Sequence, residues 1–168
     1  MGQYRGNPAA IRGLVREDAV HRDLYLDPEV FALEMEELWA KTWIYAGHAS
    51  QVPNPGDYYT CTIGAEPVVM VRHTDGSVRV LRNRCAHKGT KVVAATCGNV
   101  GRFFRCPYHA WSYRTDGTLA AVPLRGGYDG TGFATSEAVR GMVPVNTVDY
   151  RGFVFAKLSD EGPGFHEY

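Results

Sequence analysis

The sequence predicts a mainly β protein in which an antiparallel β sandwich or small barrel follows one amphipathic helix. Two observations predict the β part. Short runs rich in β-branched and aromatic residues recur after residue 42, and turn-forming sequences separate several of them. A third observation, a helix-start signal followed by apolar residues at helical spacing, predicts the helix. The 168 residues suffice for one domain with its own core.

The helix is expected over about residues 28–41. Asp27 is a candidate N-cap, Pro28 stands at the first helical position, and Glu29 adds a carboxylate near the positive end of the helix. Apolar side chains then recur at helical spacing, and we expect them in the core rather than around a cofactor; they are Phe31, Met35, Leu38 and Trp39.

Eight strands are expected, over residues 43–46, 58–63, 68–72, 78–83, 102–105, 112–114, 143–148 and 153–156. Between them, residues 53–56, 74–77 and 115–118 combine Gly with Pro, Asn or Asp, as turns do. Short strands at regular intervals favour a sandwich or small barrel. We therefore expect an N-terminal segment over residues 1–42 and a β domain over residues 43–160.

The composition is that of an ordinary globular protein, with 45% apolar residues, 21% charged residues and a formal net charge of zero. No apolar run approaches the length of about 20 residues that a transmembrane helix needs, and residues 1–6 carry no apolar signal core. We expect a cytoplasmic protein with no membrane and no nucleic-acid partner. The glycine-rich stretch 125–132 matches no nucleotide-binding motif, and we expect a surface loop there.

Two short motifs carry the chemistry. Cys85-Ala86-His87 and Cys106-Pro107-Tyr108-His109 each place one thiolate and one imidazole on a tight loop. A cysteine quartet favours zinc or an ordinary iron–sulfur cluster, whereas a Cys/His pair from each loop suits a [2Fe–2S] centre with one iron on sulfur and one on imidazole. A structural zinc site remains the alternative, although zinc sites usually pair Cys with Cys and His with His.

Both motifs resemble, residue by residue, the cluster loops of the Rieske family. The resemblance implies that Cys85 and Cys106 bind the inner iron and that His87 and His109 bind the outer iron. It also implies a Rieske-type antiparallel β architecture with these loops at one end. Two further side chains, Lys88 and Trp111, are candidates to cover the cluster.

Asn83–Gly89 and Phe104–Trp111 are similar to the cluster loops of aromatic ring-hydroxylating dioxygenase large (alpha) subunits, and the resemblance covers roughly residues 20–160. It implies an oxidoreductase part that takes electrons from a ferredoxin or reductase. In that family the cluster passes electrons to a mononuclear non-heme Fe(II) in the catalytic domain of a neighbouring subunit. The resemblance therefore implies that catalytic domain and a homo-oligomer as partners, and it allows a small subunit.

The sequence departs from this family at its carboxyl end, Phe165-His166-Glu167-Tyr168, where no second iron domain begins. We expect residues 161–168 to start a link to a catalytic domain that is absent from this sequence. No residue of this chain is then catalytic, and the chain alone transfers electrons without hydroxylating a substrate. A free-standing Rieske ferredoxin is the alternative function, and a zinc-binding module is a further one.

The resemblance also bears on the reduction potential. Respiratory-chain Rieske proteins have a serine where this chain has Trp111, a tyrosine where it keeps Tyr113, and a disulfide where it has Thr90 and Tyr108. Hydrogen bonds to the cluster sulfurs stabilise the reduced state. This chain offers fewer donors for such bonds, so we expect a reduction potential at the low end of the Rieske range.

Two cysteines lie outside the motifs. Cys61 falls within an expected strand and is interpreted as a small buried hydrophobe, whereas Cys97 falls in a turn-like stretch and is not expected to bind metal. A reducing compartment disfavours disulfides between these four cysteines.

The region around the motifs is cationic. Between residues 82 and 114 there are no acidic residues and seven basic ones, which are Arg82, Arg84, Lys88, Lys91, Arg102, Arg105 and Arg114. Individually such side chains are usually solvated or salt-bridged. Together they are expected to favour a reduced centre and to attract an acidic electron-transfer partner.

Overall fold

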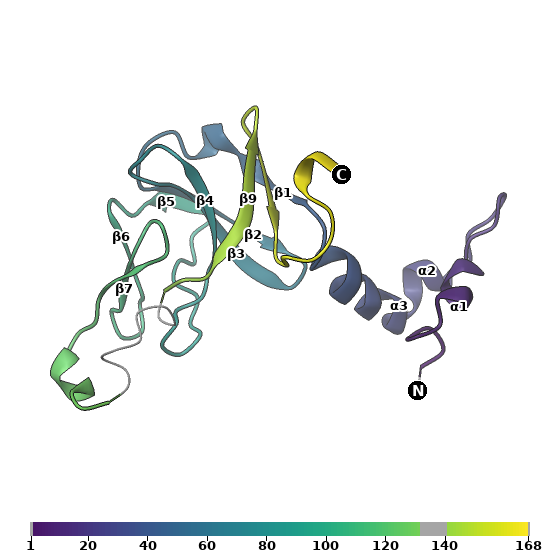
Figure 1. Cartoon of the computed structure of the whole chain (residues 1–168), viewed down its shortest axis with the longest axis horizontal. Helices are drawn as coiled ribbons and strands as arrows, with labels where there is room; N and C mark the ends of the chain where they lie inside the picture. The colour runs from purple at the N-terminus through teal and green to yellow at the C-terminus, as the bar shows by residue number, and fades with distance from the viewer. Residues whose placement is uncertain (1, 132–140, 168) are drawn as a thin grey trace.

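The computed structural model describes residues 2–131 and 141–167 and is mainly β, with a curled half-barrel sheet as its body (Figure 1). The large sheet is antiparallel and has the order β1-β10-β9-β4-β3-β2-β5. Its strands are β1 (Ile44–His48), β2 (Asp57–Ile63), β3 (Glu66–Arg72), β4 (Val78–Arg82), β5 (Cys97–Asn99), β9 (Pro144–Tyr150) and β10 (Phe153–Lys157). A smaller antiparallel sheet consists of β6 (Phe103–Arg105), β7 (Ser112–Arg114) and β8 (Leu119–Ala121).

All eight expected strands form, and the expectation of a mainly antiparallel β fold is confirmed. Two further strands, β5 and β8, were not expected. The turn-like interpretation of Cys97 is wrong, because this residue lies in β5 and pairs with Tyr59 of β2. Neither Cys-Gly-Asn nor Leu-Ala-Ala has a strand pattern of its own, so these segments become strands only through the neighbours with which they pair.

Strand β3 is buried on both faces and divides the core in two. Val69 and Val71 point into a cluster shared with the small sheet, whereas Val68 and Met70 point into a second cluster beneath β1, β9 and β10. All four side chains have no exposed surface, which explains why this strand is a continuous apolar run rather than an alternating one.

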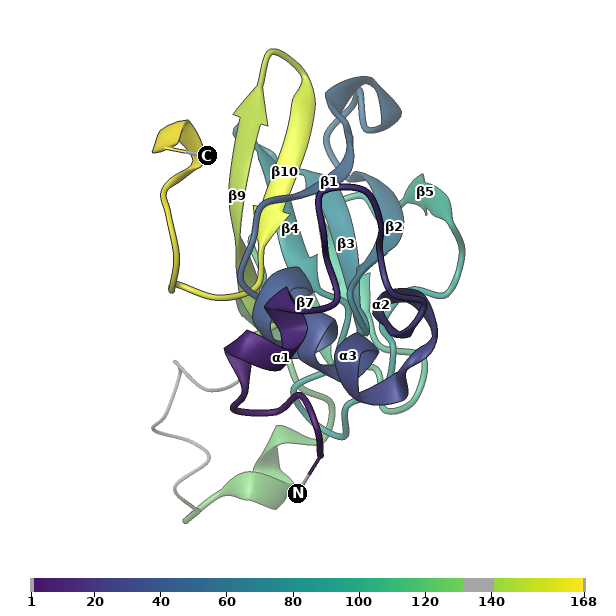
Figure 2. The same cartoon turned by 90° about the vertical axis from the view of Figure 1, so that its right-hand side faces the viewer.

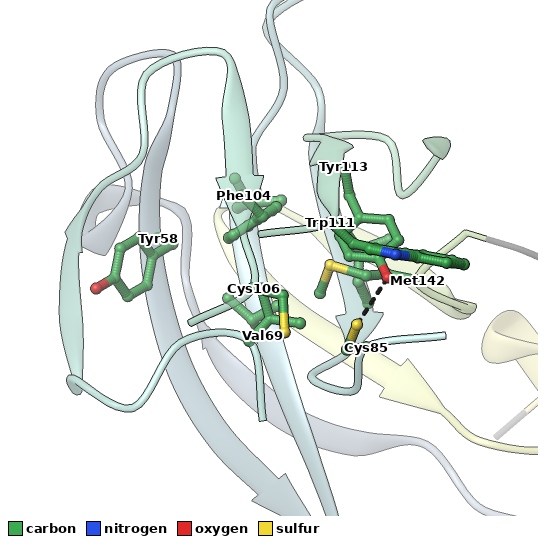
Figure 3. Packing of buried hydrophobic residues seen from close by; sticks show 11 residues of the cluster. Tyr58, Val69, Cys85, Phe104, Cys106, Trp111, Tyr113 and Met142 are labelled. Carbon is green, nitrogen blue, oxygen red and sulfur yellow. Dashed lines mark hydrogen bonds between the residues drawn. The ribbon is translucent and has the colours of Figure 1, made fainter. Parts of the chain in front are cut away.

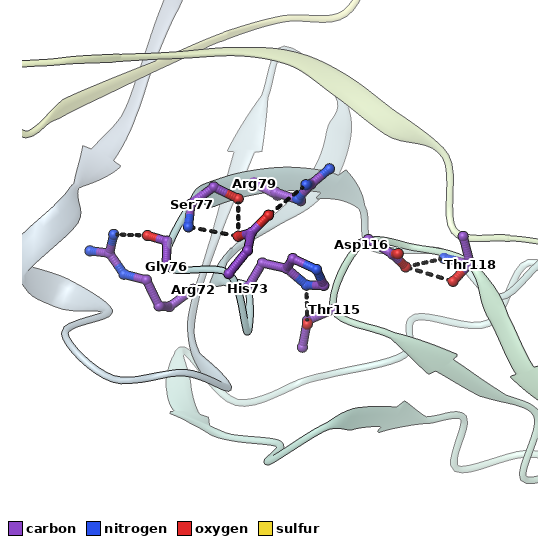
Figure 4. Close-up of polar contacts among 9 residues, drawn as sticks. Arg72, His73, Gly76, Ser77, Arg79, Thr115, Asp116 and Thr118 are labelled. Carbon is purple, nitrogen blue, oxygen red and sulfur yellow. Dashed lines mark hydrogen bonds and ion pairs between the residues drawn. The ribbon is translucent and has the colours of Figure 1, made fainter.

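Two turns of nearly identical sequence bring the sheets together (Figure 4). In the β3–β4 turn, the backbone N–H of Ser77 donates to Asp75 Oδ1 over 2.8 Å, and in the β7–β8 turn Thr118 does the same to Asp116. The turns are adjacent, because the His73 ring lies 2.6 Å from the hydroxyl of buried Thr115. This contact fastens the small sheet to the large one.

A glycine completes the same junction. Gly117, in the β7–β8 turn, has φ +92°, and a Cβ there would come 2.5 Å from the carbonyl oxygen of Met142. The absence of a side chain lets the Met142 N–H donate to the Gly117 carbonyl over 2.8 Å. The chain that leads into β9 is therefore bonded directly to the small sheet.

The N-terminal segment forms helices that extend from one end of the large sheet (Figures 1 and 2). They are α1 (Pro8–Arg12), α2 (Asp23–Leu26), α3 (Pro28–Leu33) and η1 (Glu34–Trp39), the last being a π-helical turn. Asp27 caps α3 as expected, accepting from the backbone N–H groups of Glu29 and Val30. The helix expected over about residues 28–41 thus corresponds to α3 continued by η1.

The expectation that this helix buries Phe31, Leu38 and Trp39 is wrong, since these side chains are 60%, 49% and 38% exposed. The helices extend away from the sheet, and η1 contacts it only at its edge, where Met35 and Trp39 lie against Gly64 in the β2–β3 turn. Instead, Val30 packs with Tyr4 and Leu14 in a small separate cluster.

The other helical turns within residues 2–131 and 141–167 are η2 (Ala49–Gln51), η3 (Arg125–Tyr128) and η6 (Phe165–Glu167). Phe165 of η6 lies against Phe155 of β10, with ring centroids 5.1 Å apart, so the carboxyl-terminal segment runs beside the large sheet (Figure 2). None of the helices in the described ranges is both long and apolar enough to span a membrane. Residue 132, the last of the glycine-rich stretch, lies outside the described residues.

Candidate metal centre

Two loops carry the four candidate ligands. The first follows β4 and contains Cys85 and His87. Its ends are joined by two backbone hydrogen bonds, from the Cys85 N–H to the Thr90 carbonyl and from the Gly89 N–H to the Cys85 carbonyl, each 2.8 Å. Gly89 has φ +71°, the left-handed conformation that lets the loop close so tightly.

The second loop connects β6 to β7 and closes in the same way. The Cys106 N–H donates to the Trp111 carbonyl over 2.8 Å, and the Ala110 N–H donates to the Cys106 carbonyl over 3.0 Å. Ala110 has φ +56° and occupies the position that Gly89 occupies in the first loop. The two loops therefore share one backbone design, although His87 is two residues after its cysteine and His109 is three.

A buried asparagine that sequence reasoning missed holds the base of the first loop. Asn83 is 1% exposed, and its side-chain oxygen accepts from the backbone N–H groups of Val92 and Val93 at 3.0 and 3.1 Å. Its amide nitrogen donates to the Val93 carbonyl over 2.8 Å. Asn83 thus ties together the two ends of the loop, and its polarity at the end of an apolar strand is the signal that could have identified it.

The cysteines lie inside and the histidines lie at the surface. Cys85 and Cys106 are each 3% exposed and belong to one core cluster (Figure 3). The rings of His87 and His109 meet edge to face, with centroids 4.7 Å apart. His87 is partly buried and His109 is exposed. The fold thus brings the two loops together with their thiols on one side and their imidazoles on the other.

Tyr113, on the inner face of β7, is bonded to the first loop. Its hydroxyl oxygen lies 2.9 Å from the Cys85 sulfur and accepts from the Ala86 N–H over 3.1 Å (Figure 3). Since the backbone donor occupies an acceptor position of the hydroxyl, its hydrogen is free to point at the sulfur. Burial, and then the contact with Cys85, raise the pKa of Tyr113, so the hydroxyl remains a donor.

Trp111 lies flat against a candidate ligand. Its indole is 2% exposed and stacks on the His87 ring with a centroid distance of 4.8 Å and an interplanar angle of 7°. Tyr128 of η3 meets the indole edge to face. Burial, then the nearby charges of His109 and Lys88, lower the pKa of His87, which favours the neutral imidazole that metal ions bind. Lys88 itself is exposed, and no described residue forms a hydrogen bond or ion pair with it.

The donor atoms fit a cluster with two protein ligands on each iron. His87 Nδ1 is buried and has no hydrogen-bond partner, as expected for an atom reserved for a metal. All four cysteines are free thiols, which leaves Cys85 and Cys106 available as thiolates. Within the described residues, no three His, Cys, Asp or Glu side chains gather as a site for one metal ion.

The other two cysteines are not part of this centre. Cys61 is partly buried beside the second core cluster, and burial raises the pKa of its thiol to about 11. A thiol of such pKa is a poor nucleophile and a poor metal ligand at neutral pH. Cys97 is exposed on β5.

An open hollow of about 470 Å³ lies over the two histidines. Its lining also includes Trp111 and residues of the β8–β9 connection, namely Pro123, Leu124, Gly127 and Tyr128. Over residues 125–131 the glycine-rich stretch lies mostly exposed at the surface, but it begins with the η3 turn rather than an irregular loop, and sequence reasoning missed that Gly127 and Tyr128 border this hollow.

The cationic block, meaning the seven basic residues between residues 82 and 114, is only partly neutralised by carboxylates. Arg82 and Arg84 both pair with Glu66, at 3.2 and 2.9 Å. In the described parts of the chain, no carboxylate pairs with the other five basic residues, which are Lys88, Lys91, Arg102, Arg105 and Arg114.

Comparison with known proteins agrees with this geometry. A family model described as the Rieske [2Fe-2S] domain matches residues 42–137. The chain is 38% identical over 142 residues to the anthranilate 1,2-dioxygenase large subunit of Acinetobacter baylyi, an alignment that covers 84% of this chain and 29% of that subunit.

Two solved structures have the same fold. Naphthalene 1,2-dioxygenase from Rhodococcus sp., bound to indole, has a TM-score of 0.79 and 32% identity over 88% of this chain and 33% of that one. A quaternary ammonium Rieske monooxygenase, whose structure is described as revealing insights into inter-subunit electron transfer, has a TM-score of 0.78 and 29% identity over 87% and 39%. The chain thus spans about a third of the length of these relatives. It belongs to the Rieske [2Fe–2S] domain family and is homologous to the amino-terminal part of ring-hydroxylating dioxygenase large subunits.

Proposed function

We propose that Cys85, His87, Cys106 and His109 hold a [2Fe–2S] centre through which the chain transfers electrons. The observation that carries this proposal is the meeting of the two loops, with both cysteines in one buried cluster and both imidazoles 4.7 Å apart at the surface. When bound, such a centre supplies one-electron transfer, and Rieske centres span roughly −150 to +300 mV.

The surrounding residues have distinct tasks in this proposal. Tyr113 donates to the sulfur of Cys85 and thereby stabilises additional negative charge on it. Trp111 fixes the plane of the His87 ring and shields one of its faces from water. Because His87 and His109 border the open hollow, a partner that enters this hollow reaches both rings directly.

The pairing of one thiol and one imidazole on each loop favours two protein ligands on each of two irons over four on one zinc. A structural zinc ion needs four protein donors converging on a single point. In the described residues not even three candidate donors converge in that way, whereas the meeting of one thiol side and one imidazole side suits a two-iron centre.

The complete protein is proposed to be the large subunit of a ring-hydroxylating dioxygenase. Residues 1–42 would then be the N-terminal segment, residues 43–160 the Rieske domain and residues 161–168 the start of a link to a catalytic domain with a mononuclear non-heme iron. That iron would receive electrons within the same assembly, which the description of inter-subunit transfer in the monooxygenase supports. The donor would be a ferredoxin or reductase, and the four free thiols support a cytoplasmic location.

The helical segment supports assembly into an oligomer. Tyr25, Leu26 and Phe31 lie within seven residues of one another and are 76%, 73% and 60% exposed, so the segment presents several large apolar side chains at its surface. A large subunit would cover such side chains against a second copy or a small subunit. A free-standing ferredoxin, the alternative function, would remain monomeric in size-exclusion chromatography.

The test of the proposed function is a reductive titration of the purified chain under anaerobic conditions. We expect uptake of one electron per chain and an electron-spin resonance signal in the reduced state. The His109→Ala variant should lose the signal, whereas His166→Ala, a control on the exposed η6 turn, should retain it. A chain that takes up no electron would overturn the proposal.

A further inference from the structure

The small sheet has one buried face and one exposed face. Phe104 of β6 and Tyr113 of β7 are paired in register and both are fully buried in the cluster that contains the two cysteines. Because side chains alternate along a strand, their neighbours point the other way. Phe103, Arg105 and Arg114 are accordingly exposed on the outer face.

This outer face surrounds one aromatic side chain with positive charge. Phe103 is 46% exposed, and Arg114 lies directly opposite it in the β6–β7 register. Arg105 follows two residues later on the same side of β6, and Arg102 is exposed in the turn that leads directly into Phe103. Directly opposed side chains on antiparallel strands have Cβ atoms about 5 Å apart. We call these four residues the outer arginine face.

The charges of this face are available to a partner. Among the residues that the structure describes, none provides a carboxylate partner for Arg102, Arg105 or Arg114, and the guanidinium of Arg114 donates to the Thr118 hydroxyl and the Leu119 carbonyl. By contrast, Arg82 and Arg84 are held by Glu66. Arginine and exposed aromatic side chains are also the types that dominate binding at protein interfaces.

The face lies directly behind the thiol side of the centre. Arg105 directly precedes the candidate ligand Cys106 in the chain. The inner face of the same sheet carries Tyr113, whose hydroxyl contacts the sulfur of Cys85. The hollow over the histidines is a different surface, because its lining includes none of the four residues of the outer arginine face. An electron can therefore arrive through the small sheet and leave through the histidines without the two partners competing for one surface.

We propose that the outer arginine face is the docking surface for the electron donor, and that this donor is an acidic one-electron carrier protein. The inference rests on the proposed function and adds where the donor binds and by which charges. In the docked complex the donor is oxidised by one electron and the bound centre is reduced by one, with no group transferred. Phe103 provides the apolar contact, and the arginines provide steering and orientation.

The test measures the second-order rate at which a reduced plant-type [2Fe–2S] ferredoxin reduces the chain in a stopped-flow instrument. Such ferredoxins have potentials of about −400 mV, so transfer to a Rieske centre is downhill. The double variant Arg105→Glu/Arg114→Glu should react at least about tenfold more slowly at low salt. The control Arg12→Glu/Arg16→Glu, which changes the net charge equally on the N-terminal segment, should stay within about twofold.

The salt dependence of the reduction rate distinguishes weaker docking of the ferredoxin from a change in the reduction potential of the centre. Screening at about 0.5 M salt should bring the double variant close to the wild-type rate, which a change in potential would not do. Phe103→Ala should slow the reaction at every salt concentration. Equal slowing of both double variants, an unchanged rate in Arg105→Glu/Arg114→Glu, or no reduction of the wild type by the ferredoxin would overturn the docking surface. Dithionite is a small reductant that needs no docking surface. If it still reduced all variants in each of these cases, the proposed electron-transfer function would stand and only the docking surface would be wrong.

Discussion

The hydroxyl oxygen of Tyr113 lies 2.9 Å from the sulfur of Cys85, and the Ala86 N–H fixes that hydroxyl from the other side. In the structure the sulfur belongs to a free thiol, which stands in for the thiolate ligand of the proposed centre. A thiolate only accepts hydrogen bonds, so the tyrosine must then be the donor.

Replacing Tyr113 with Phe removes this donor and should lower the reduction potential. The hydrogen bond favours the more negative, reduced state, and a bond to a charged group of about 1.5–3 kcal/mol sets an upper limit of roughly 130 mV for a one-electron couple. We expect a decrease of tens of millivolts in a redox titration. Tyr25→Phe, an exposed control on α2, should leave the potential unchanged; equal potentials for Tyr113→Phe and wild type would show that the contact has no such role.

Trp111 should stabilise the fold and position His87. Trp111→Ala removes a buried indole and should lower the free energy of unfolding by about 3–5 kcal/mol in urea. Trp111→Phe retains a ring against the imidazole, so it should cost less and should restore the wild-type electron-spin resonance line shape. If the Phe and Ala variants gave the same altered line shape, stacking would not be what positions His87.

The two ligand loops offer a matched test of backbone strain. Ala110 adopts φ +56° in the place where the other loop has Gly89 at φ +71°. A left-handed conformation costs a residue with a Cβ roughly 1–2 kcal/mol, so Ala110→Gly should stabilise the protein by up to about 1 kcal/mol. Gly89→Ala should destabilise it by a similar amount through strain alone, because a Cβ there would meet no atom within 4 Å. Urea unfolding would measure both, and changes of the same sign would refute the shared backbone design.

The β3–β4 turn should contribute stability that is lost in acid. The hydroxyl and backbone N–H of Ser77, with the Arg79 guanidinium, lower the pKa of Asp75 to about 2. Because this value is below that of the unfolded chain, about 3.9, the contribution is fully present above roughly pH 5. It declines as the pH falls from about 4 towards 2.

Asp75→Asn should therefore be less stable than wild type at neutral pH, and the difference should shrink between pH 4 and pH 2. Unfolding in urea, followed by circular dichroism at several pH values, would measure it. Asp18→Asn is a suitable control, since Asp18 is exposed and forms no hydrogen bond or ion pair with the described residues. A difference that did not change with pH would contradict the role of the ionised carboxylate.

How much the sequence predicted depends on where the determining contacts lie. The cap at Asp27, the eight strands and the ligand loops follow from local patterns, because turns, caps and motif spacing act over a few residues. The exposure of Phe31 could not be predicted, since helical spacing shows which face is apolar but not whether another element covers it. The same limit applies to β5, which exists only through its pairing with β2.

The candidate site divides in the same way. The four candidate ligands and Trp111 were found from the motifs alone. The bonds of Asn83 to its loop and the closeness of Tyr128 to Trp111 depend on segments that meet only in the folded chain. The sequence also could not show which basic residues are paired and which are free of a carboxylate, because this depends on which arginines reach Glu66.

The central claim is that two thiols and two imidazoles of this chain hold two irons and two sulfides. The most direct measurement is the content of iron, acid-labile sulfide and zinc in anaerobically purified protein. We predict about two irons and two sulfides per chain with no stoichiometric zinc, the loss of both in Cys106→Ala, and their retention in Cys97→Ala. One zinc per chain without sulfide, or full iron and sulfide in Cys106→Ala, would contradict the account.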